Sequence, residues 1–477
     1  MTQTTEKNQT TLILVVLMIG TFVAMLNQTL LTAALPKIMV DLQIDANKGQ
    51  WLTTAFMLVN GIMIPITAYL INVLRTRVLF ISAMGIFTIG TLIAAFSDSF
   101  NLLMIGRIFQ ALGAGIMMPL TQTVLLFLFP PEKRGAVMGM MGIVIAFAPA
   151  VGPTISGWLV DSYNWNSLFY VIAPIAIIDI IMAVFLLKNV GKTTPTKLDA
   201  LSVATSTLGF GGLLYGFSSQ GTYGWANGHV YWPLLIGSIS LIIFTWRQLT
   251  LEQPLLDLRV LKSRPFTISI LITVLLFASM IAGGMIIPLY VQSALGYSAF
   301  HSGLLLLPGA ALMGIMSPIN GRIFDKYGPR KLSTIGMVIL TAGSVPFMFL
   351  TDDISLTYLV LVYSLRMLGI SMVMMPLTTW GMNSLSNAKL AHGSAVNNTL
   401  RQVAGSIGTA ILFTVMSNGT KSSDAATPVL KLIHGMNLAF GVAAVLSLIG
   451  LIGTFIFVKE QNGLTTMKSE KTTKATV

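Results

Sequence analysis

Two related stretches decide the fold of this chain: Arg107-Ile-Phe-Gln-Ala-Leu-Gly-Ala-Gly-Ile-Met-Met-Pro119 and, about 260 residues later, Arg366-Met-Leu-Gly-Ile-Ser-Met-Val-Met-Met-Pro376. Each contains an arginine, a Leu-Gly step and a Met-Met-Pro sequence inside an otherwise apolar run. An arginine at membrane depth costs at least about 2.5 kcal/mol, so such residues usually face a protein interior or a water-filled cavity and carry function. The repetition predicts a membrane protein made of two related halves, and a further pair of stretches, beginning at Gly61 and Gly314, has nearly the same spacing.

The composition of the chain places it in a lipid bilayer. Apolar residues make up 54% of the sequence, charged residues make up only 9%, and the mean hydropathy is +0.81, which excludes a soluble globular protein. Runs of about 20 apolar residues are long enough to cross the hydrocarbon core as helices, and the sequence contains fourteen of them. The expected spans are residues 11–33, 51–72, 78–96, 102–128, 136–160, 167–187, 199–218, 230–249, 267–291, 302–320, 331–350, 355–380, 396–417 and 432–458.

Basic residues are distributed unevenly between the loops on the two sides of the membrane. With a cytoplasmic N-terminus, the inner loops hold most of the lysines and arginines, and the outer loops hold only Lys37, Lys48, Lys421 and Lys431. By the positive-inside rule we expect a multi-pass protein of the plasma membrane with both termini in the cytoplasm. The net charge of +12 then reflects topology and contact with anionic membrane lipid, and we expect no nucleic-acid partner.

The spans are expected to form an all-α membrane protein of two six-helix bundles. The two copies of the repeat begin eight spans apart, and an even separation keeps both copies in the same orientation. The remaining two spans, at the centre of the chain, are expected to form an inserted helix pair. We therefore expect an N-terminal bundle (1–190), an inserted pair with a cytoplasmic linker (191–265), a C-terminal bundle (266–458) and a disordered cytoplasmic tail (459–477).

A short loop between two expected spans carries a concentrated set of charges, Gly321-Arg-Ile-Phe-Asp325-Lys-Tyr-Gly328-Pro-Arg330-Lys331. Its glycines allow a tight turn. We expect Asp325 to accept hydrogen bonds from the first amides of the following span, or to pair with Arg330 or Lys331, in a cluster that forms in one state and breaks in another. The alternative is a positively charged inner loop that only caps a helix.

The fifth expected span has a smooth and bent face. Ala148, Gly152 and Ser156 recur every four residues, so another helix can pack closely against them. Pro149 and Pro153 each remove a backbone hydrogen bond and bend the helix, which suits a seal or pivot between the bundles. Small residues and prolines are common in membrane helices, so ordinary packing is the alternative.

Proton coupling needs a group that binds and releases a proton within the membrane, and Asp179 is the only acid well inside an expected span. We expect an isolated aspartate at this depth to be neutral, because desolvation penalises the charged form. Asp179 therefore suits a proton carrier, with a structural partner for an arginine as an equal alternative. We expect Arg107 to control the protonation of a nearby acid or to bind substrate, or else to form a static tie to backbone carbonyls. Arg401 lies close enough to the cytoplasmic end of its span for its side chain to reach the interface.

Flexible and polar side chains near the repeated prolines are candidates for a promiscuous substrate cavity. Methionine adapts its shape to different ligands, and filling of helix packing is the alternative role for any one of them. Because buried acids are scarce, we expect neutral, zwitterionic or weakly charged lipophilic substrates in preference to dications. The candidate cavity residues are Asn27, Gln28, Gln110, Met117, Met118, Gln122, Arg366, Met374 and Met375.

Three of these motifs resemble signatures of the major facilitator superfamily. The stretch from Gly321 to Lys331 resembles its cytoplasmic-loop signature. The first repeat resembles its fourth-helix signature through Arg107, Gln110, Gly113 and Gly115. The stretch from Ala148 to Gly157 is similar to the fifth-helix signature of its antiporters. With fourteen spans, and with Asn397-Asn-Thr-Leu-Arg401-Gln402 followed by Gly405 and Gly408 in the thirteenth span, the chain resembles the fourteen-helix drug:proton antiporter branch. The conformational switch implied by the resemblance comprises Pro149, Gly152, Pro153, Gly157, Gly321, Asp325, Gly328, Arg330 and Lys331.

The resemblance implies a secondary active transporter that exports amphipathic drugs or toxic compounds in exchange for protons, by alternating access between two rocking bundles. We expect a monomer with no enzymatic activity, no cofactor and no metal ion. Asn27 departs from the family pattern, because many relatives carry an acid in the first helix. Export of a lipid, sugar or other metabolite is the alternative within transport, and a channel or a non-transporting sensor is the alternative outside it. An ATP-driven pump is excluded, because Gly191-Lys-Thr193 lacks the upstream glycine of a phosphate-binding loop.

Overall fold

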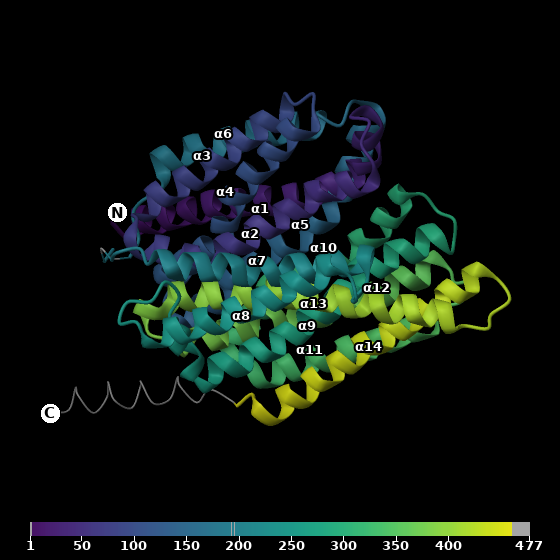
Figure 1. The fold of residues 1–477 in the computed structure, drawn as a ribbon. Coiled ribbons are helices and arrows are strands. Elements are labelled where there is room, and N and C mark those ends of the chain that lie inside the picture. Colours follow the sequence, from purple (N-terminus) through teal and green to yellow (C-terminus); the bar gives the residue numbers. More distant parts are fainter. Residues whose placement is uncertain (1, 192, 195, 460–477) are drawn as a thin grey trace.

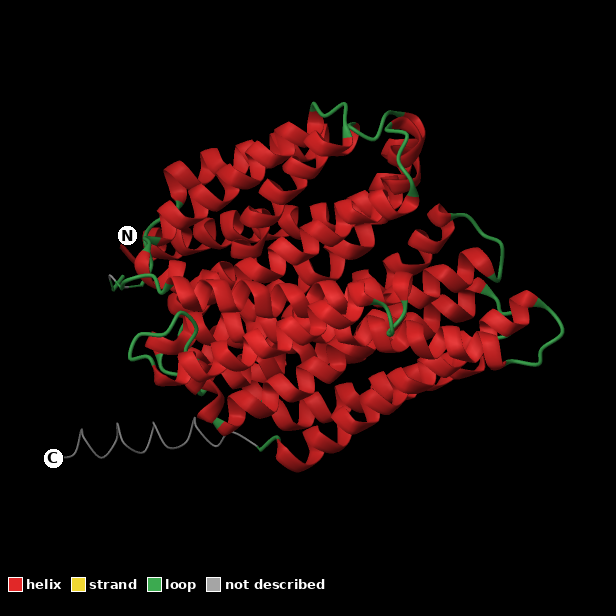
Figure 2. Ribbon diagram, in the orientation of Figure 1, coloured by secondary structure: helices red, strands yellow, loops and turns green. Residues whose placement is uncertain are grey.

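The computed structural model describes residues 2–191, 193, 194 and 196–459, and the regular structure of this part of the chain is helical (Figure 2). Fourteen helices are long and apolar enough to cross a membrane, as expected from the sequence. The disordered tail expected over residues 459–477 lies, apart from its first residue, outside the described residues. The helices of the first half are α1 (Thr2–Asp41), α2 (Ala46–Val73), α3 (Thr76–Ala95), α4 (Phe100–Leu128), η1 (Pro131–Lys133), α5 (Arg134–Ser162), α6 (Ser167–Leu186) and α7 (Ala200–Tyr223). Those of the second half are α8 (Gly228–Thr250), η2 (Leu258–Lys262), α9 (Arg264–Ser293), α10 (Ala299–Tyr327), α11 (Pro329–Ser344), η3 (Val345–Phe349), α12 (Leu356–Asn383), η4 (Asn387–Lys389), α13 (Leu390–Ser422) and α14 (Pro428–Phe457).

Twelve of the fourteen long helices form two bundles of six, α1–α6 and α9–α14, which lie one above the other in Figure 1. In the first bundle α1 packs against α4, α5 and α6, and in the second α9 packs against α12, α13 and α14. The pairs α3–α4 and α11–α12 are equivalent in the same way. The expected fold class, an all-α membrane protein of two related bundles with an inserted helix pair, is confirmed.

The Leu-Gly steps of the repeated stretches become close helix contacts. Gly113 of α4 lies against Ala83 of α3, and Gly369 of α12 lies against Gly336 of α11. A Cβ atom added at either glycine would collide with a backbone oxygen of the neighbouring helix. These glycines allow two helix backbones to approach closely, which is a common way for helices to associate in a membrane.

The interface between the two bundles is closed at one end. Because α1 begins and α14 ends on the same side of the molecule, we call this side the amino-terminal face (Figure 1). α5 packs against α10 along most of its length, from Gly135 beside Gly321 to Thr154 beside Gly303. α13 also packs against α2 and α4, and α12 against α5.

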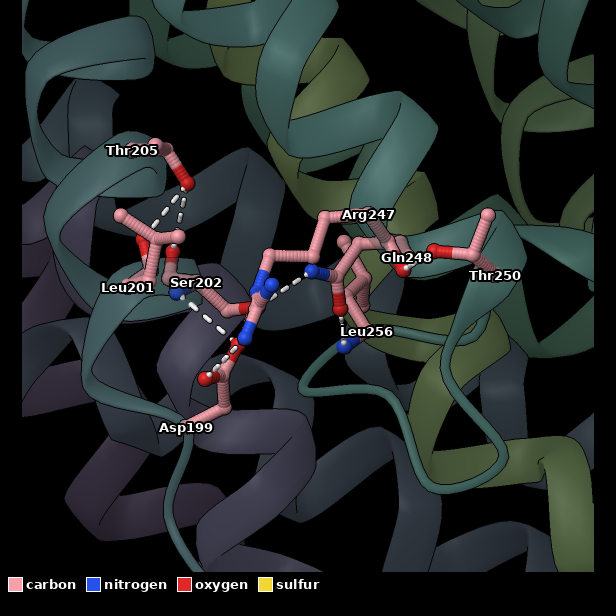
Figure 3. A network of polar contacts seen from close by, with 8 residues as sticks. All are labelled: Asp199, Leu201, Ser202, Thr205, Arg247, Gln248, Thr250 and Leu256. Carbon is pink, nitrogen blue, oxygen red and sulfur yellow. Dashed lines mark hydrogen bonds and ion pairs between the residues drawn. The ribbon is translucent and has the colours of Figure 1, made fainter.

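The inserted pair, α7 and α8, is joined by a charged network (Figure 3). Asp199 caps α7 by accepting a hydrogen bond from the backbone N–H of Ser202 at 3.1 Å. Its carboxylate also pairs with Arg247 of α8, whose Nε and Nη2 atoms lie 2.6 and 2.8 Å from the two oxygens. The hydrogen bonds from Arg247 hold the pKa of Asp199 well below its usual range. Gln248 donates to the Ser202 hydroxyl and accepts from the backbone N–H of Leu256, so the linker after α8 is tied to the same network.

α7 lies beside both bundles, because it packs against α2 of the first and α13 of the second. Trp51 of α2 stacks on Tyr215 of α7, with ring centroids 5.5 Å apart. Trp225, which follows α7, donates a hydrogen bond to Thr414 of α13 at 3.1 Å. The insertion therefore bridges the two bundles.

Candidate functional site

Arg107 is fully buried in α4, toward the end that lies away from the amino-terminal face. Its guanidinium donates to the side chain of Gln110 at 3.0 Å, to the backbone oxygen of Leu52 at 3.3 Å and to both oxygens of Asn27 at 3.4 Å. The guanidinium carbon lies 4.2 Å from the centre of the Phe56 ring. Neutral acceptors and an aromatic face therefore stabilise this cation, and none of its described partners is a carboxylate.

Arg366 is the equivalent cation of the second bundle and is also fully buried. Its Nε atom donates to the hydroxyl of Ser344 at 2.9 Å, and its Nη2 atom donates to the hydroxyl of Ser279 at 3.0 Å and to the backbone oxygen of the same residue. The ring of Phe440 lies 6.0 Å from the guanidinium carbon. Arg107 is bound by α1, α2 and its own helix, and Arg366 by α9 and α11, so each arginine lies inside its own bundle. The structure does not bring Arg366 together with the other expected cavity residues.

Asp179 is buried in α6 and faces α1 and α3 of its own bundle. A Cβ atom added at Gly20 of α1 would lie 2.8 Å from both the Asp179 Oδ2 atom and the Phe80 ring. Neither carboxylate oxygen of Asp179 has a hydrogen-bond partner among the described residues. The pairing with an arginine, which we weighed as the alternative, is therefore not present in the described part of the chain.

The charged loop after α10 links the two bundles, by a contact that we did not expect. Asp325 accepts hydrogen bonds from the backbone N–H groups of Gly135, at 2.8 Å, and Ala136, at 2.9 Å, in the first turn of α5. The expected capping of α11 was wrong, because the N-cap residue of that helix is Gly328 and no side chain caps it. The first turn of α5 has unpaired N–H groups and the positive end of the helix dipole, and the closed interface brings it to the carboxylate.

The same loop also contains the expected tight turn and two exposed basic residues. Gly328 has a φ of 78°, a left-handed conformation that favours glycine, so the expected tight turn is present. Arg330 and Lys331 are exposed. The guanidinium carbon of Arg330 lies 5.9 Å from the centre of the Phe455 ring in α14, so this described contact lies within the second bundle. The expected pairing of Arg330 with Asp325 is not among the described contacts.

A second link between the bundles lies at the equivalent position of the first half, and the sequence did not reveal it. The repeat that relates the two halves aligns Asn72, at the end of α2, with Asp325. The Nδ2 atom of Asn72 lies 3.0 Å from Nε2 of His392, in the first turn of α13. The Nδ1 atom of His392 accepts from the backbone N–H of Asp257, in the linker after α8, at 3.1 Å. Only the repeat spacing could have revealed Asn72, because an amide gives no charge signal.

Two further groups of hydrogen bonds close the same half of the interface. Gln122 of α4, an expected cavity residue, accepts from the side chains of Ser394 at 2.9 Å and Asn398 at 2.8 Å, both on α13. Arg134, at the start of α5, donates to the side-chain oxygen of Asn383, at the end of α12, at 3.1 Å. These hydrogen bonds and the contacts of Asp325 and Asn72 lie near the amino-terminal face, and we call them together the polar seal.

The residues expected to form a seal or pivot in α5 lie in one continuous helix. Gly152 is buried against Thr29 of α1, Pro149 is exposed and Pro153 is half-buried. A Cβ atom added at Gly157 would meet no atom within 4 Å. The described contacts of Gly152 are therefore with its own bundle.

The closest contacts of α5 with the other bundle come from glycines outside the fifth-helix motif. Gly135 lies against Gly321, and Gly139 and Gly142 lie against Ser317, all on α10. A Cβ atom added at Gly139 would lie 2.5 Å from the backbone oxygen of Ser317. Glycines at these positions keep the two helices in contact and give the interface a smooth surface.

The expected cavity residues do not converge on one site. Asn27 and Gln110 bind Arg107, while Gln122 belongs to the seal. Met117, Met374 and Met375 are buried in the hydrophobic cores, Met118 is partly buried, and Gln28 is half-buried. Arg401 was expected to reach the interface with water, but only 5% of it is exposed, and its guanidinium lies against Phe277 and Met374.

Two homologous bundles, closed against one another at one face by polar contacts, are typical of a membrane transporter. The family model described as Major Facilitator Superfamily matches residues 17–409, so the chain belongs to this family of transporters. It is 53% identical over 446 residues to the uncharacterized MFS-type transporter YcnB of Bacillus subtilis, a match that covers 94% of each chain. It is 41% identical over 442 residues to the lincomycin resistance protein LmrB of Listeria monocytogenes, covering 90% of this chain and 93% of that protein. The human organic anion transporter MFSD10 (TETRAN) shares the fold, with a TM-score of 0.62 at 13% identity over 93% of this chain and 99% of that chain.

Proposed function

We propose that this chain exports amphipathic toxic compounds across the plasma membrane in exchange for protons. The observation that carries the proposal is the capping of α5 by Asp325, because this contact joins two bundles that must separate during transport. The similarity to LmrB, whose name refers to lincomycin resistance, supports an amphipathic drug as the substrate.

In this proposal the amino-terminal face is cytoplasmic, as the positive-inside rule predicts. Lys133, Lys326 and Arg330 are exposed near this face, where they meet anionic lipid of the inner leaflet. The contacts of Asp325 and Asn72 then close the cytoplasmic side in the described conformation. An inward-facing state requires both contacts to break, so any ligand that favours this state must bind it more tightly.

We assign proton binding to Asp179. In this proposal Arg107 changes its contacts when Asp179 gains or loses a proton. The carboxyl group of Asp179 has no described hydrogen-bond partner, so it exchanges a proton without first breaking a structural contact. It packs against Gly20 of α1, and the same helix carries Asn27, whose oxygens accept from Arg107. A shift of α1 on protonation would therefore change the contacts of Arg107.

The test is proton movement driven by lincomycin in liposomes that contain the purified protein and a pH-sensitive dye. The wild type should move protons when lincomycin is added, and Asp179→Asn should abolish this movement but still bind lincomycin. Asp424→Asn is the matched control, because it removes an exposed acid outside the expected spans. Normal exchange by Asp179→Asn would overturn the assignment of this residue, and lincomycin flux without proton movement would overturn antiport.

A further inference from the structure

Arg401 differs from the other buried arginines of the described chain, Arg107, Arg134 and Arg366, in having almost no hydrogen-bond partner. It lies in the middle of α13, with 5% of its surface exposed. Its Nη2 atom lies 3.8 Å from the sulfur of Met374, a weak acceptor, and its Nε and Nη1 atoms have no partner among the described residues. Arg107, Arg134 and Arg366 each donate to at least two oxygen-bearing residues, so the guanidinium of Arg401 is the least satisfied of the four.

A second unpaired donor lies one turn away on the same helix face. Asn397 precedes Arg401 by four residues, a spacing that brings two side chains together on an α-helix. Only 2% of Asn397 is exposed, and its Nδ2 atom has no described partner. Three buried nitrogen atoms, Nδ2 of Asn397 and Nε and Nη1 of Arg401, therefore lack an acceptor, and buried donors of this kind are normally bonded.

The surroundings of Arg401 suit the apolar part of a ligand. The guanidinium carbon lies 4.9 Å from the centre of the Phe277 ring on α9, and the Met374 side chain of α12 lies on another side. A flat aromatic ring and a flexible thioether accept different hydrocarbon groups. The described ion pairs of the chain do not include Arg401, so its positive charge also remains uncompensated.

Arg401 lies next to the interface that opens during transport. Its neighbour Gln402 lies against Gly61 of α2, and Asn398, on the preceding turn, donates to Gln122 of α4 at 2.8 Å. Both contacts cross between the bundles, so rocking of the bundles uncovers α13 directly beside the guanidinium. A ligand in the opened interface can therefore reach the unpaired donors.

We infer that Arg401 and Asn397 form a binding site for the carboxylate of a lipophilic acid or zwitterion, with Phe277 and Met374 against its apolar part. The planar guanidinium binds a carboxylate through two parallel hydrogen bonds, and the Asn397 amide supplies a further donor. The inference rests on the proposed function, because the bound compound is a transported substrate. It adds to the proposed substrates a class of compounds that carry a carboxylate together with a large apolar group.

The experiment measures equilibrium binding of dansylated undecanoic acid and of its methyl ester to the purified protein in lipid nanodiscs, by dansyl fluorescence. The wild type should bind the acid at least about tenfold more tightly than the ester, as expected for a hydrogen bond to a charged group. Arg401→Gln should remove this preference, Arg401→Lys should restore part of it, and Asn397→Ala should weaken acid binding alone. Arg75→Gln is the matched control, because it removes an exposed arginine near the amino-terminal face.

Equal binding of the acid and the ester by the wild type would overturn the inference, and so would an equal loss of both in Arg401→Gln. Competition of unlabelled decanoate against decanol on the wild type gives the same answer without a variant, so a misfolded Arg401→Gln protein does not weaken the test. These measurements do not need transport. Absence of the carboxylate preference in the wild type, with intact lincomycin exchange, would overturn this inference alone, and carboxylate binding without lincomycin exchange would overturn the proposed export alone.

Discussion

Substitution of Asp325 by asparagine should open the amino-terminal face. The carboxylate accepts from two backbone N–H groups at the positive end of α5, and the amide of asparagine has only one acceptor oxygen and no charge. Loss of one hydrogen bond to a charged group and weakening of the other amount to about 2 kcal/mol for a half-buried site. The ratio of closed to open molecules should therefore fall about 30-fold.

Spin-label distances across the interface measure this change. The chain contains no cysteine, so Glu132→Cys and Ala388→Cys supply two unique labelling sites on exposed residues beside α5 and α13. Asp325→Asn should add a population with a longer distance between the labels. Asp352→Asn, which removes an exposed acid elsewhere in the second bundle, should leave the distances unchanged. An unchanged distance distribution in Asp325→Asn, or an equal shift in the control, would refute the role of this contact as a latch.

Three further changes test other parts of the structure. Asn72→Ala removes one neutral side-chain hydrogen bond, to His392, worth about 1 kcal/mol, so the same labels should report an approximately fivefold shift toward the open state, smaller than that of Asp325→Asn. Gly139→Val places a side chain against the α10 backbone and should lower lincomycin exchange by separating the bundles, whereas Gly157→Val, in open space, should not. Asp199→Asn should lower the melting temperature at pH 7; because the folded pKa of Asp199 is depressed, this difference should begin to shrink as the pH falls below about 4 and should disappear only below the folded pKa, and a difference that does not shrink with falling pH would contradict the charge-based explanation.

The fold was predictable because its main signals are local and repeated. The length of each apolar run predicted the fourteen helices, and the Arg107 and Arg366 stretches predicted two equivalent bundles. The burial of both arginines also followed from the cost of a cation in lipid. These inferences needed only the spacing and polarity of residues along the chain.

The contacts of the candidate site were less predictable, because they join residues far apart in the sequence. Asp325 has several nearby charges in its own loop, yet its described partners are backbone N–H groups of Gly135 and Ala136, which any residue type would supply. Arg401 was expected to extend toward water, but its contacts with Phe277 and Met374 keep the side chain inside the bundle. The orientation of one side chain within a helix bundle depends on packing that sequence spacing does not specify.

The inserted pair has a consequence for the path of hydrophobic compounds that dissolve in the bilayer. Two seams between the bundles run along the membrane, one between α5 and α10 and the other between α2 and α13. α7 packs on both α2 and α13 and so covers the second seam from the lipid side. A compound that diffuses sideways out of a leaflet therefore has only the α5–α10 seam available, and the extra hairpin makes lateral access one-sided.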